Sequence, residues 1–291
     1  MKSSFSELSY AFALTENLVN SLGLPLLTAP TFPSTAAEGK KGAGHDLKLS
    51  MPGMSLFLQF KLSHCMRYAS AKEFTSGKFH KKIGGKTAPV YRMYLHPLKS
   101  SRQTSLMLKL EKRHGFVYYV APLFHLPIDL SKHFFAKTVA QESRFLRPSV
   151  IKKMPDQNEH FVSFRRTGKP WRFSDDPVEL EGAETQDQVL IRIREELSQK
   201  ISAKERVEES LDQMLEVLVE DANERQVGAR AMRNEVGRIR GLDMPLLEKT
   251  GFVARNFFDV EMLTFGSSSP VGPPDTDPGG DGGGANEGYA I

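Results

Sequence analysis

Residues 44–63, GHDLKLSMPGMSLFLQFKLS, decide the fold of the first part of this chain. Two short apolar runs flank Pro52-Gly53, the preferred central pair of a type II turn. Side chains on a strand alternate between its two faces, so the second run has an apolar face and a mixed one. The apolar face carries Leu56, Leu58, Phe60 and Leu62, and the mixed face carries Phe57, Gln59 and Lys61. The stretch therefore predicts two adjacent strands with one shared apolar face.

The pairing across the turn decides which polar groups meet. If Pro52 and Gly53 form the whole turn, Leu47 lies opposite Leu58 and Asp46 lies opposite Gln59. Asp46, Gln59 and Lys61 then converge on the face away from the leucines, although a bulge or longer loop would change this register. An alternative interpretation is a solvated polar face on which Asp46 and Lys61 pair weakly.

The surrounding segments predict an ordered set of elements. Residues 4–22 predict a helix with a Ser4-x-x-Glu7 capping box and a buried stripe of Phe5, Leu8, Phe12, Thr15, Val19 and Leu22. Residues 90–97 predict a strand, residues 100–115 a helix that stops at Gly115, and residues 116–122 a strand covered on both faces. A helix over residues 129–143 and a strand over residues 159–166 follow. The order to residue 122 is helix, three strands, helix, strand.

The character of the chain changes after residue 173. Thr185-x-x-Gln188 and Ser202-x-x-Glu205 are capping boxes that predict two separate helices. Residues 223–243 are arginine-rich and weakly patterned, and a short helix and a late strand follow over residues 244–266. From Ser267 the chain has too little apolar surface to fold and predicts a disordered tail rich in Gly and Pro. We therefore expect a basic domain over residues 1–173, an acidic helical region over 174–266 and a tail over 267–291.

Charge is unevenly divided along the 291 residues. Residues 1–173 hold 27 Lys and Arg against 10 Asp and Glu, whereas the rest hold 12 against 25, which together give the net charge of +4. A basic first part favours a polyanionic partner, although solubility alone can explain such a charge.

Cys65 is the single cysteine, so no disulfide can form within the chain and a reducing compartment is indicated. No apolar run is long enough to cross a membrane, and Glu7 and Glu16 interrupt the apolar pattern at the start, which argues against a secretory signal. A cytoplasmic protein without membrane contact is expected.

Asp46 followed by Gln59-Phe60-Lys61 resembles the D…(E/Q)xK signature of the PD-(D/E)XK nuclease superfamily, nearest to its Mrr-like branch with glutamine at the second position. The resemblance covers residues 1–170 at most, and His45 stands where the family name has proline. It implies a mixed α/β (α+β) fold with a restriction-endonuclease-like αβββαβ core, to which the helical region and the tail are appended. Family members often serve in defence against foreign DNA or in repair.

The activity that the resemblance implies is a metal-dependent hydrolysis of phosphodiester bonds in DNA, with RNA as a further substrate class. Asp46 and Gln59 would hold Mg²⁺ or Mn²⁺, and Lys61 would orient the attacking water or neutralise charge on the phosphate. Glu7 is the candidate additional metal ligand, because many members carry a glutamate in the first helix; its other role is the capping box. Gln59 replaces a carboxylate and so removes one negative charge from the site.

Two basic segments are candidate contacts to a phosphate backbone. The first is a loop with Lys78, Lys81, Lys82 and Lys86, which is otherwise a solvated loop. The second, FRRTGKPWRF over residues 164–173, interleaves aromatic rings with Arg165, Arg166 and Lys169, a pattern that suits base stacking but also a domain boundary.

Two other functions remain open. One is an inactive nucleic-acid-binding module of the same fold, which Gln59 favours. The other is an interaction protein that uses the helices at residues 185–222 to bind a protein partner or a second copy of itself. No zinc-binding spacing, P-loop or GxGxxG occurs in the chain.

Overall fold

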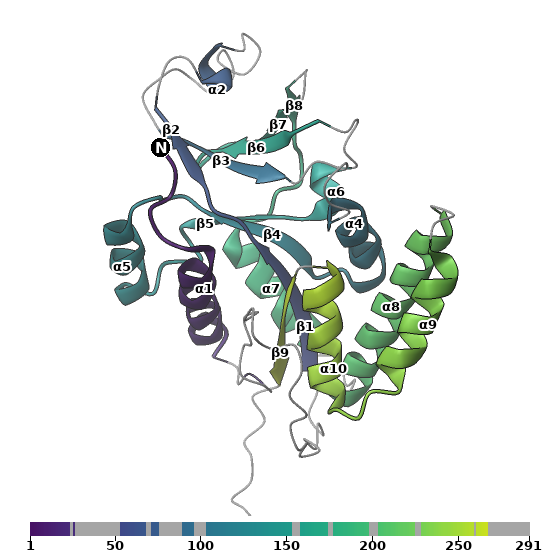
Figure 1. Ribbon diagram of the computed structural model, residues 1–291. Coiled ribbons are helices and arrows are strands. Elements are labelled where there is room, and N and C mark those ends of the chain that lie inside the picture. The colour runs from purple at the N-terminus through teal and green to yellow at the C-terminus, as the bar shows by residue number, and fades with distance from the viewer. Residues whose placement is uncertain are drawn as a thin grey trace, which may run out of the picture.

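The computed structural model describes ten ranges of the chain: residues 1–23, 26, 53–67, 71–75, 89–95, 103–152, 158–173, 177–197, 203–224, and 228–266 without residue 259. In the described residues, helices and two β-sheets form a mixed α/β protein (Figure 1). The expected tail, Asp46, the lysine loop at 78–86 and the strand expected before Pro52 lie outside these ranges. No described helix is both long and apolar enough to cross a membrane.

The first sheet has the strand order β5-β4-β1-β9. Its strands are β1 (Gly53–Phe60), β4 (Val117–Pro122), β5 (Ser143–Leu146) and β9 (Glu261–Gly266). β1 is central, since it runs parallel to β4 on one edge and antiparallel to β9 on the other. Leu58 has Tyr118 beside it on one edge and Glu261 on the other, so both edges of this residue are occupied. The predicted register, which set Leu47 opposite Leu58 and Asp46 opposite Gln59, is therefore wrong.

The second sheet has the strand order β2-β3-β6-β7-β8. Its strands are β2 (His64–Met66), β3 (Val90–Leu95), β6 (His160–Phe164), β7 (Trp171–Phe173) and β8 (Val178–Glu179). The expected strands at 90–97 and 159–166 are confirmed. The short strands β2, β5, β7 and β8 were not predicted, because two to four residues give no readable alternation.

Helices cover both faces of the first sheet. The helices of the described residues are α1 (Glu7–Leu22), α2 (Lys72–Thr75), α4 (Gln103–His114), α5 (Pro127–Phe135), α6 (Pro148–Ile151), α7 (Gln186–Leu197), α8 (Ala203–Glu224), α9 (Ala229–Arg240) and α10 (Leu246–Val253), which continues into the π-helical turn η1 (Ala254–Phe258). α1 and α7 pack on the face that carries Leu56, Leu58 and Phe60. α4, α8 and α10 pack on the face that carries Phe57, and one face of the second sheet joins that core.

Two helix boundaries follow the sequence closely. Gly115 adopts a positive φ of 73°, which a residue with a side chain rarely adopts, and its N–H bonds to the carbonyl of Glu111 to end α4. At α7, the N–H of Thr185 donates to Gln188 Oε1 at 2.8 Å, and the N–H of Gln188 donates back to Thr185 Oγ1 at 3.4 Å. The stop at Gly115 and the Thr185 capping box are both confirmed.

α1 differs from its prediction in two ways. Its N-cap is Ser6, whose hydroxyl accepts from the N–H of Ser9, so the predicted Ser4–Glu7 capping box is wrong. Leu8 and Phe12 lie on the exposed side of the helix at 55% and 56% exposure, whereas Tyr10 and the residues one turn apart from it enter the core. Both sides of α1 are apolar, so the periodicity was compatible with either side, and the sheet packs against the side that carries Tyr10.

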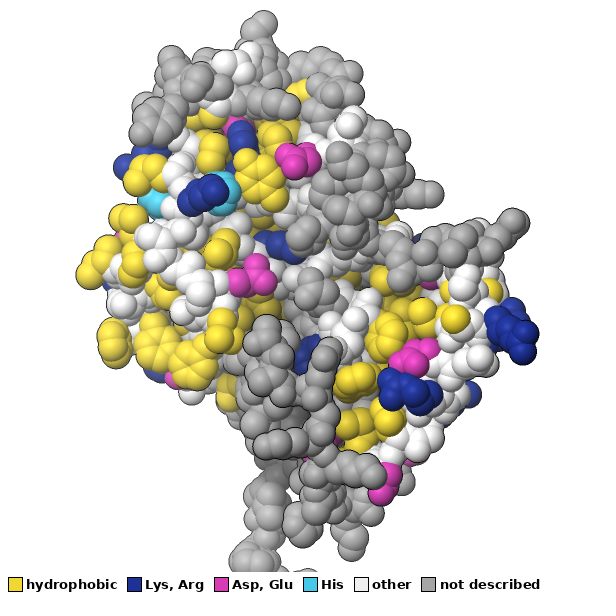
Figure 2. All heavy atoms as spheres, viewed as in Figure 1, with side chains coloured by type: hydrophobic (Ala, Val, Ile, Leu, Met, Phe, Trp, Pro, Cys, Tyr) yellow, Lys and Arg dark blue, Asp and Glu magenta, His cyan; other side chains and the backbone are white. Residues whose placement is uncertain are grey.

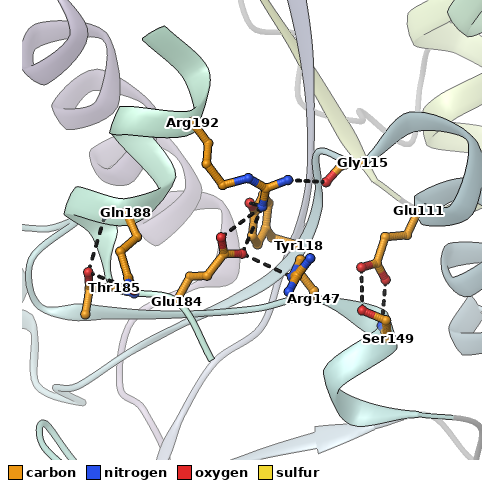
Figure 3. A network of polar contacts seen from close by, with 9 residues as sticks. All are labelled: Glu111, Gly115, Tyr118, Arg147, Ser149, Glu184, Thr185, Gln188 and Arg192. Carbon is orange, nitrogen blue, oxygen red and sulfur yellow. Dashed lines mark hydrogen bonds and ion pairs between the residues drawn. The ribbon is translucent and has the colours of Figure 1, made fainter. Parts of the chain in front are cut away.

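Residues after 173 complete the core of the first part of the chain. β9 pairs with β1, and α8 packs along α4, where Arg113 forms ion pairs with Glu216 at 2.7 Å and Glu220 at 3.3 Å. Figure 3 shows a further connection, in which Glu184 accepts from Arg192 at 2.9 Å and pairs with Arg147 at 3.2 Å. The boundary expected at residue 173 therefore does not coincide with a break in packing.

The polar network of Figure 3 fixes α7 against the first sheet. Arg192 also donates to the hydroxyl of Tyr118 at 2.8 Å and lies over the ring of Phe116, with 5.0 Å between the guanidinium carbon and the ring centroid. Burial, followed by the charge of Glu184, raises the pKa of Tyr118, so its hydroxyl stays neutral. The Glu184 carboxylate thus binds Arg192 and Arg147, and Arg192 connects it to Tyr118 on β4.

Candidate functional site

Gln59 lies at the end of the central strand and is 3% exposed. Because side chains alternate along β1, it takes the face of Phe57, which packs against α4. Gln103 Nε2, in the first turn of α4, donates to Gln59 Oε1 at 2.7 Å, and Gln59 Nε2 donates to the carbonyl of Phe60 at 3.2 Å. These two bonds fix the orientation of the Gln59 amide, and its carbonyl oxygen retains one of two acceptor positions.

Lys61 lies two residues beyond Gln59, just past the end of β1. Its backbone N–H donates to the carbonyl of Val120 at 2.9 Å, which continues the ladder between β1 and β4 by one step beyond Phe60. Lys61 is 8% exposed, although lysine is among the residues least often buried. Alternation along this extended ladder would put Gln59 and Lys61 on one face. Both residues are shielded from solvent, so the alternative of a solvated polar surface is wrong for these two residues.

The first turn of α4 supplies polar groups that the sequence analysis missed. Gln103 and Thr104 are 5% and 2% exposed, and Tyr119 donates to Thr104 Oγ1 at 3.3 Å. Gln103 lies three and four residues before Leu106 and Met107, so helical spacing places it on the buried stripe of α4. That spacing was a readable signal for a polar residue facing the core near Gln59.

Glu7, the expected third metal ligand, belongs to a different side of the sheet. It is the first residue of α1 and is exposed. α1 packs on Leu58 and Phe60, with the Tyr10 and Phe60 ring centroids 6.0 Å apart, whereas Gln59 faces α4. The structure thus places Gln59 beside α4 and places Glu7 at the start of a helix that packs on the opposite face of the sheet.

The second basic segment forms the turn between β6 and β7, and carboxylates neutralise part of it. Arg166 makes a two-pronged ion pair with Glu142, and Lys169 lies 2.7 Å from Glu181 and 3.4 Å from Glu179. Burial lowers the pKa of Arg165. The rings expected to stack on bases, Phe164, Trp171 and Phe173, are at most 5% exposed. Stacking of these three rings on bases is therefore wrong, because the segment is a hairpin that buries them within one sheet.

The described residues include one of the two oxygen donors expected for a divalent cation, the amide of Gln59. Among them, no group of three or more His, Cys, Asp or Glu side chains lies close enough to hold a metal ion. The Gln59 carbonyl is a hard oxygen donor with an acceptor position left, which suits Mg²⁺ or Mn²⁺. The carboxylate of the expected set, Asp46, lies outside the described residues.

Comparison with known proteins adds no further constraint. No family model, curated protein or solved structure matches the chain.

Proposed function

We propose that this protein is a metal-dependent phosphodiesterase that cleaves DNA at the end of β1. The observation that carries the proposal is the burial of Gln59, at the end of β1, and of Lys61, two residues further along the chain, which are 3% and 8% exposed. Lysine is among the residues least often buried, so a lysine that is 8% exposed beside a buried amide is an unusual pair of groups for a sheet core. The D…QxK pattern and the basic charge of residues 1–173 supply the substrate class.

In this proposal each residue has one role. Asp46 and the free acceptor position of Gln59 would hold Mg²⁺ or Mn²⁺, which supplies Lewis-acid activation when bound. Lys61 would donate hydrogen bonds to the scissile phosphate and neutralise the charge that develops there. Gln103 would keep the Gln59 oxygen from rotating away, because it donates to that oxygen at 2.7 Å.

Gln59 supports a second candidate function. An amide carries no negative charge, so it holds a divalent ion less strongly than a carboxylate does. A protein of this kind that binds DNA through its basic surface without cleaving it is the alternative, and its signature is binding that does not depend on metal or on Lys61.

Cleavage of supercoiled and linear DNA with Mg²⁺ or Mn²⁺ tests the proposal. Wild type is compared with Lys61→Ala and with Lys112→Ala, a matched control in which an exposed lysine on α4 is removed. We expect cleavage by wild type and Lys112→Ala, its loss in EDTA, and a drop of at least 100-fold in Lys61→Ala. Circular dichroism and thermal unfolding establish that the variants are folded.

Two outcomes contradict this function. Binding without cleavage in all three proteins supports the inactive module, and absence of both binding and cleavage supports the interaction protein. Equal cleavage by wild type and by folded Lys61→Ala removes Lys61 from the site.

A further inference from the structure

The outer face of the second sheet carries a continuous row of aromatic rings. Directly opposed residues share a face, and His64 opposes Arg92 while Tyr94 opposes Phe161. Phe161 in turn opposes Phe173 on β7. The row therefore crosses four neighbouring strands on the side of the sheet away from α4.

Ring contacts hold this row together. The centroids of His64 and Tyr94 are 5.0 Å apart, those of Tyr94 and Phe161 are 5.9 Å apart, and Phe161 and Phe173 stack at 5.0 Å with 9° between their planes. These separations lie within the range in which aromatic pairs attract. The partly exposed rings of His64 and Tyr94 thus pack next to the buried rings of Phe161 and Phe173.

Arg92 locks the exposed end of the row. Its guanidinium carbon lies 4.0 Å from the centroid of Phe161, and it donates to the hydroxyl of Tyr94 at 3.0 Å. Its charge is matched by Glu73, a fully buried carboxylate that also accepts from Ser163 at 2.6 Å. Tyr94 therefore holds a fixed orientation without a net charge beneath it.

Only one end of the row reaches solvent. Tyr94 is 38% exposed and His64 is partly exposed, whereas Phe161 and Phe173 are 6% and 2% exposed. Figure 2 shows hydrophobic side chains on this part of the molecule, with Lys or Arg and His side chains beside them. Arg92 lies over the Tyr94 ring, with 5.7 Å between the guanidinium carbon and the ring centroid, so a base would stack on the part of this ring that Arg92 and His64 leave exposed.

The electrostatic surroundings suit a base with a phosphate attached. Burial lowers the pKa of His64, and the charges of Lys2 and Arg92 lower it further, so its ring is neutral near pH 7. Lys2 is exposed, and both of its neighbours bond to residues next to His64: the Met1 ammonium donates to the carbonyl of Cys65 at 2.6 Å and the Ser3 hydroxyl to that of Ser63 at 2.8 Å. A neutral stacking surface beside an accessible ammonium complements the uncharged base and the anionic backbone of a nucleic acid.

We propose that Tyr94 and His64 form a stacking platform that binds an unpaired base of single-stranded nucleic acid, with Lys2 contacting the adjacent phosphate. The partner class rests on the proposed function, because the same polymer would supply the scissile phosphate. The platform lies on a different sheet from Gln59 and would hold a single strand during recognition rather than take part in the chemistry. Stacking on an exposed ring is tolerant of sequence, since every base has a flat face.

The test is binding of a fluorescein-labelled twenty-nucleotide oligothymidine, followed by anisotropy in EDTA so that no cleavage contributes. Tyr94→Leu keeps apolar surface but removes the ring, and we expect it to weaken binding roughly 5- to 150-fold. Tyr94→Phe keeps the ring and should bind within about threefold of wild type. Phe135→Ala is the matched control, because Phe135 is 79% exposed on α5, and it should bind as wild type does.

A second readout locates the contact directly. An oligonucleotide carrying 5-iodouracil is irradiated with the wild type, and the cross-linked peptides are identified by mass spectrometry. Cross-links at Tyr94 or His64 support the platform, and cross-links confined to other peptides overturn it. Equal binding by wild type and folded Tyr94→Leu, or no binding by wild type, also overturns it.

Failure of this proposal is distinguishable from failure of the proposed function. The binding assay contains no metal and leaves Lys61 unchanged. Equal binding by wild type and Tyr94→Leu would therefore count against the platform alone. Absence of metal-dependent cleavage with intact binding at Tyr94 counts against the enzyme alone.

Discussion

His114 at the end of α4 predicts a pH-dependent loss of stability. Its ring contacts Phe57 edge-on, with 4.6 Å between ring centroids, and its Nε2 is shielded from solvent without a hydrogen-bond partner. Burial, followed by the nearby charge of Arg206, lowers its pKa from 6.5 to about 4. The folded protein therefore resists protonation of a group that the unfolded chain protonates readily.

The sign and size follow from this difference. Below pH 6.5 the unfolded chain binds a proton at His114 that the folded protein does not bind, so the free energy of unfolding falls as the pH falls from 6.5 towards 4. Above pH 6.5 the effect vanishes. The two pKa values give a loss of roughly 2 kcal/mol at pH 5 and roughly 3 kcal/mol once the pH is below 4.

Urea denaturation between pH 4.5 and 7.5 measures this effect, with fluorescence of the single tryptophan, Trp171, which is 5% exposed, as the signal. Other groups titrate in the same range, so the informative quantity is the difference between wild type and a variant without the imidazole. His114→Phe keeps an aromatic ring against Phe57, and His114→Gln is a second variant in case the larger ring disturbs packing. Both should lose the same pH-dependent part. A difference between wild type and both variants that is constant from pH 7.5 to 4.5 would refute the reasoning.

Two further predictions concern the core. Glu184→Gln should lower the free energy of unfolding by about 1–2 kcal/mol, because Arg192 and Arg147 both pair with this carboxylate and are themselves partly exposed. Urea denaturation in low and high salt measures the loss, and an unchanged midpoint would contradict the prediction. Gln103→Leu should lower the free energy of unfolding by about 1–3 kcal/mol, since it removes the donor to the buried Gln59 oxygen. The double variant with Gln59→Leu should recover part of that loss, whereas additive losses in the double-mutant cycle would show that the hydrogen bond contributes nothing.

The sequence predicted those elements whose pattern is set locally. The run at 116–122 is apolar throughout and became β4, which is buried on both faces, and Gly115 ended the helix before it. The alternation along residues 55–62 correctly separated Phe57 from Leu56, Leu58 and Phe60, which enter two different cores. These features depend on neighbours in the chain, so a single sequence carries them.

Features set by distant partners could not be predicted in the same way. β1 received β9 as a neighbour from more than 200 residues away, and no local pattern specifies such a pairing. The helix α9 was missed because its only fully buried side chain is Ile239, so its core-facing stripe is weak. Trp171 and its aromatic neighbours had the composition of a base-stacking segment, but the β6–β7 hairpin buries their rings against the second sheet.

In the proposed function, a carboxylate joins the buried Gln59 amide to hold a divalent ion next to Lys61. Titration of Mn²⁺ into the full chain, followed by the loss of the free-ion signal in electron paramagnetic resonance, tests it most directly. The account predicts uptake of Mn²⁺ by wild type, tighter uptake by Gln59→Glu and at least tenfold weaker uptake by Asp46→Asn. Identical uptake by all three folded proteins, or none by wild type and Gln59→Glu, would contradict it.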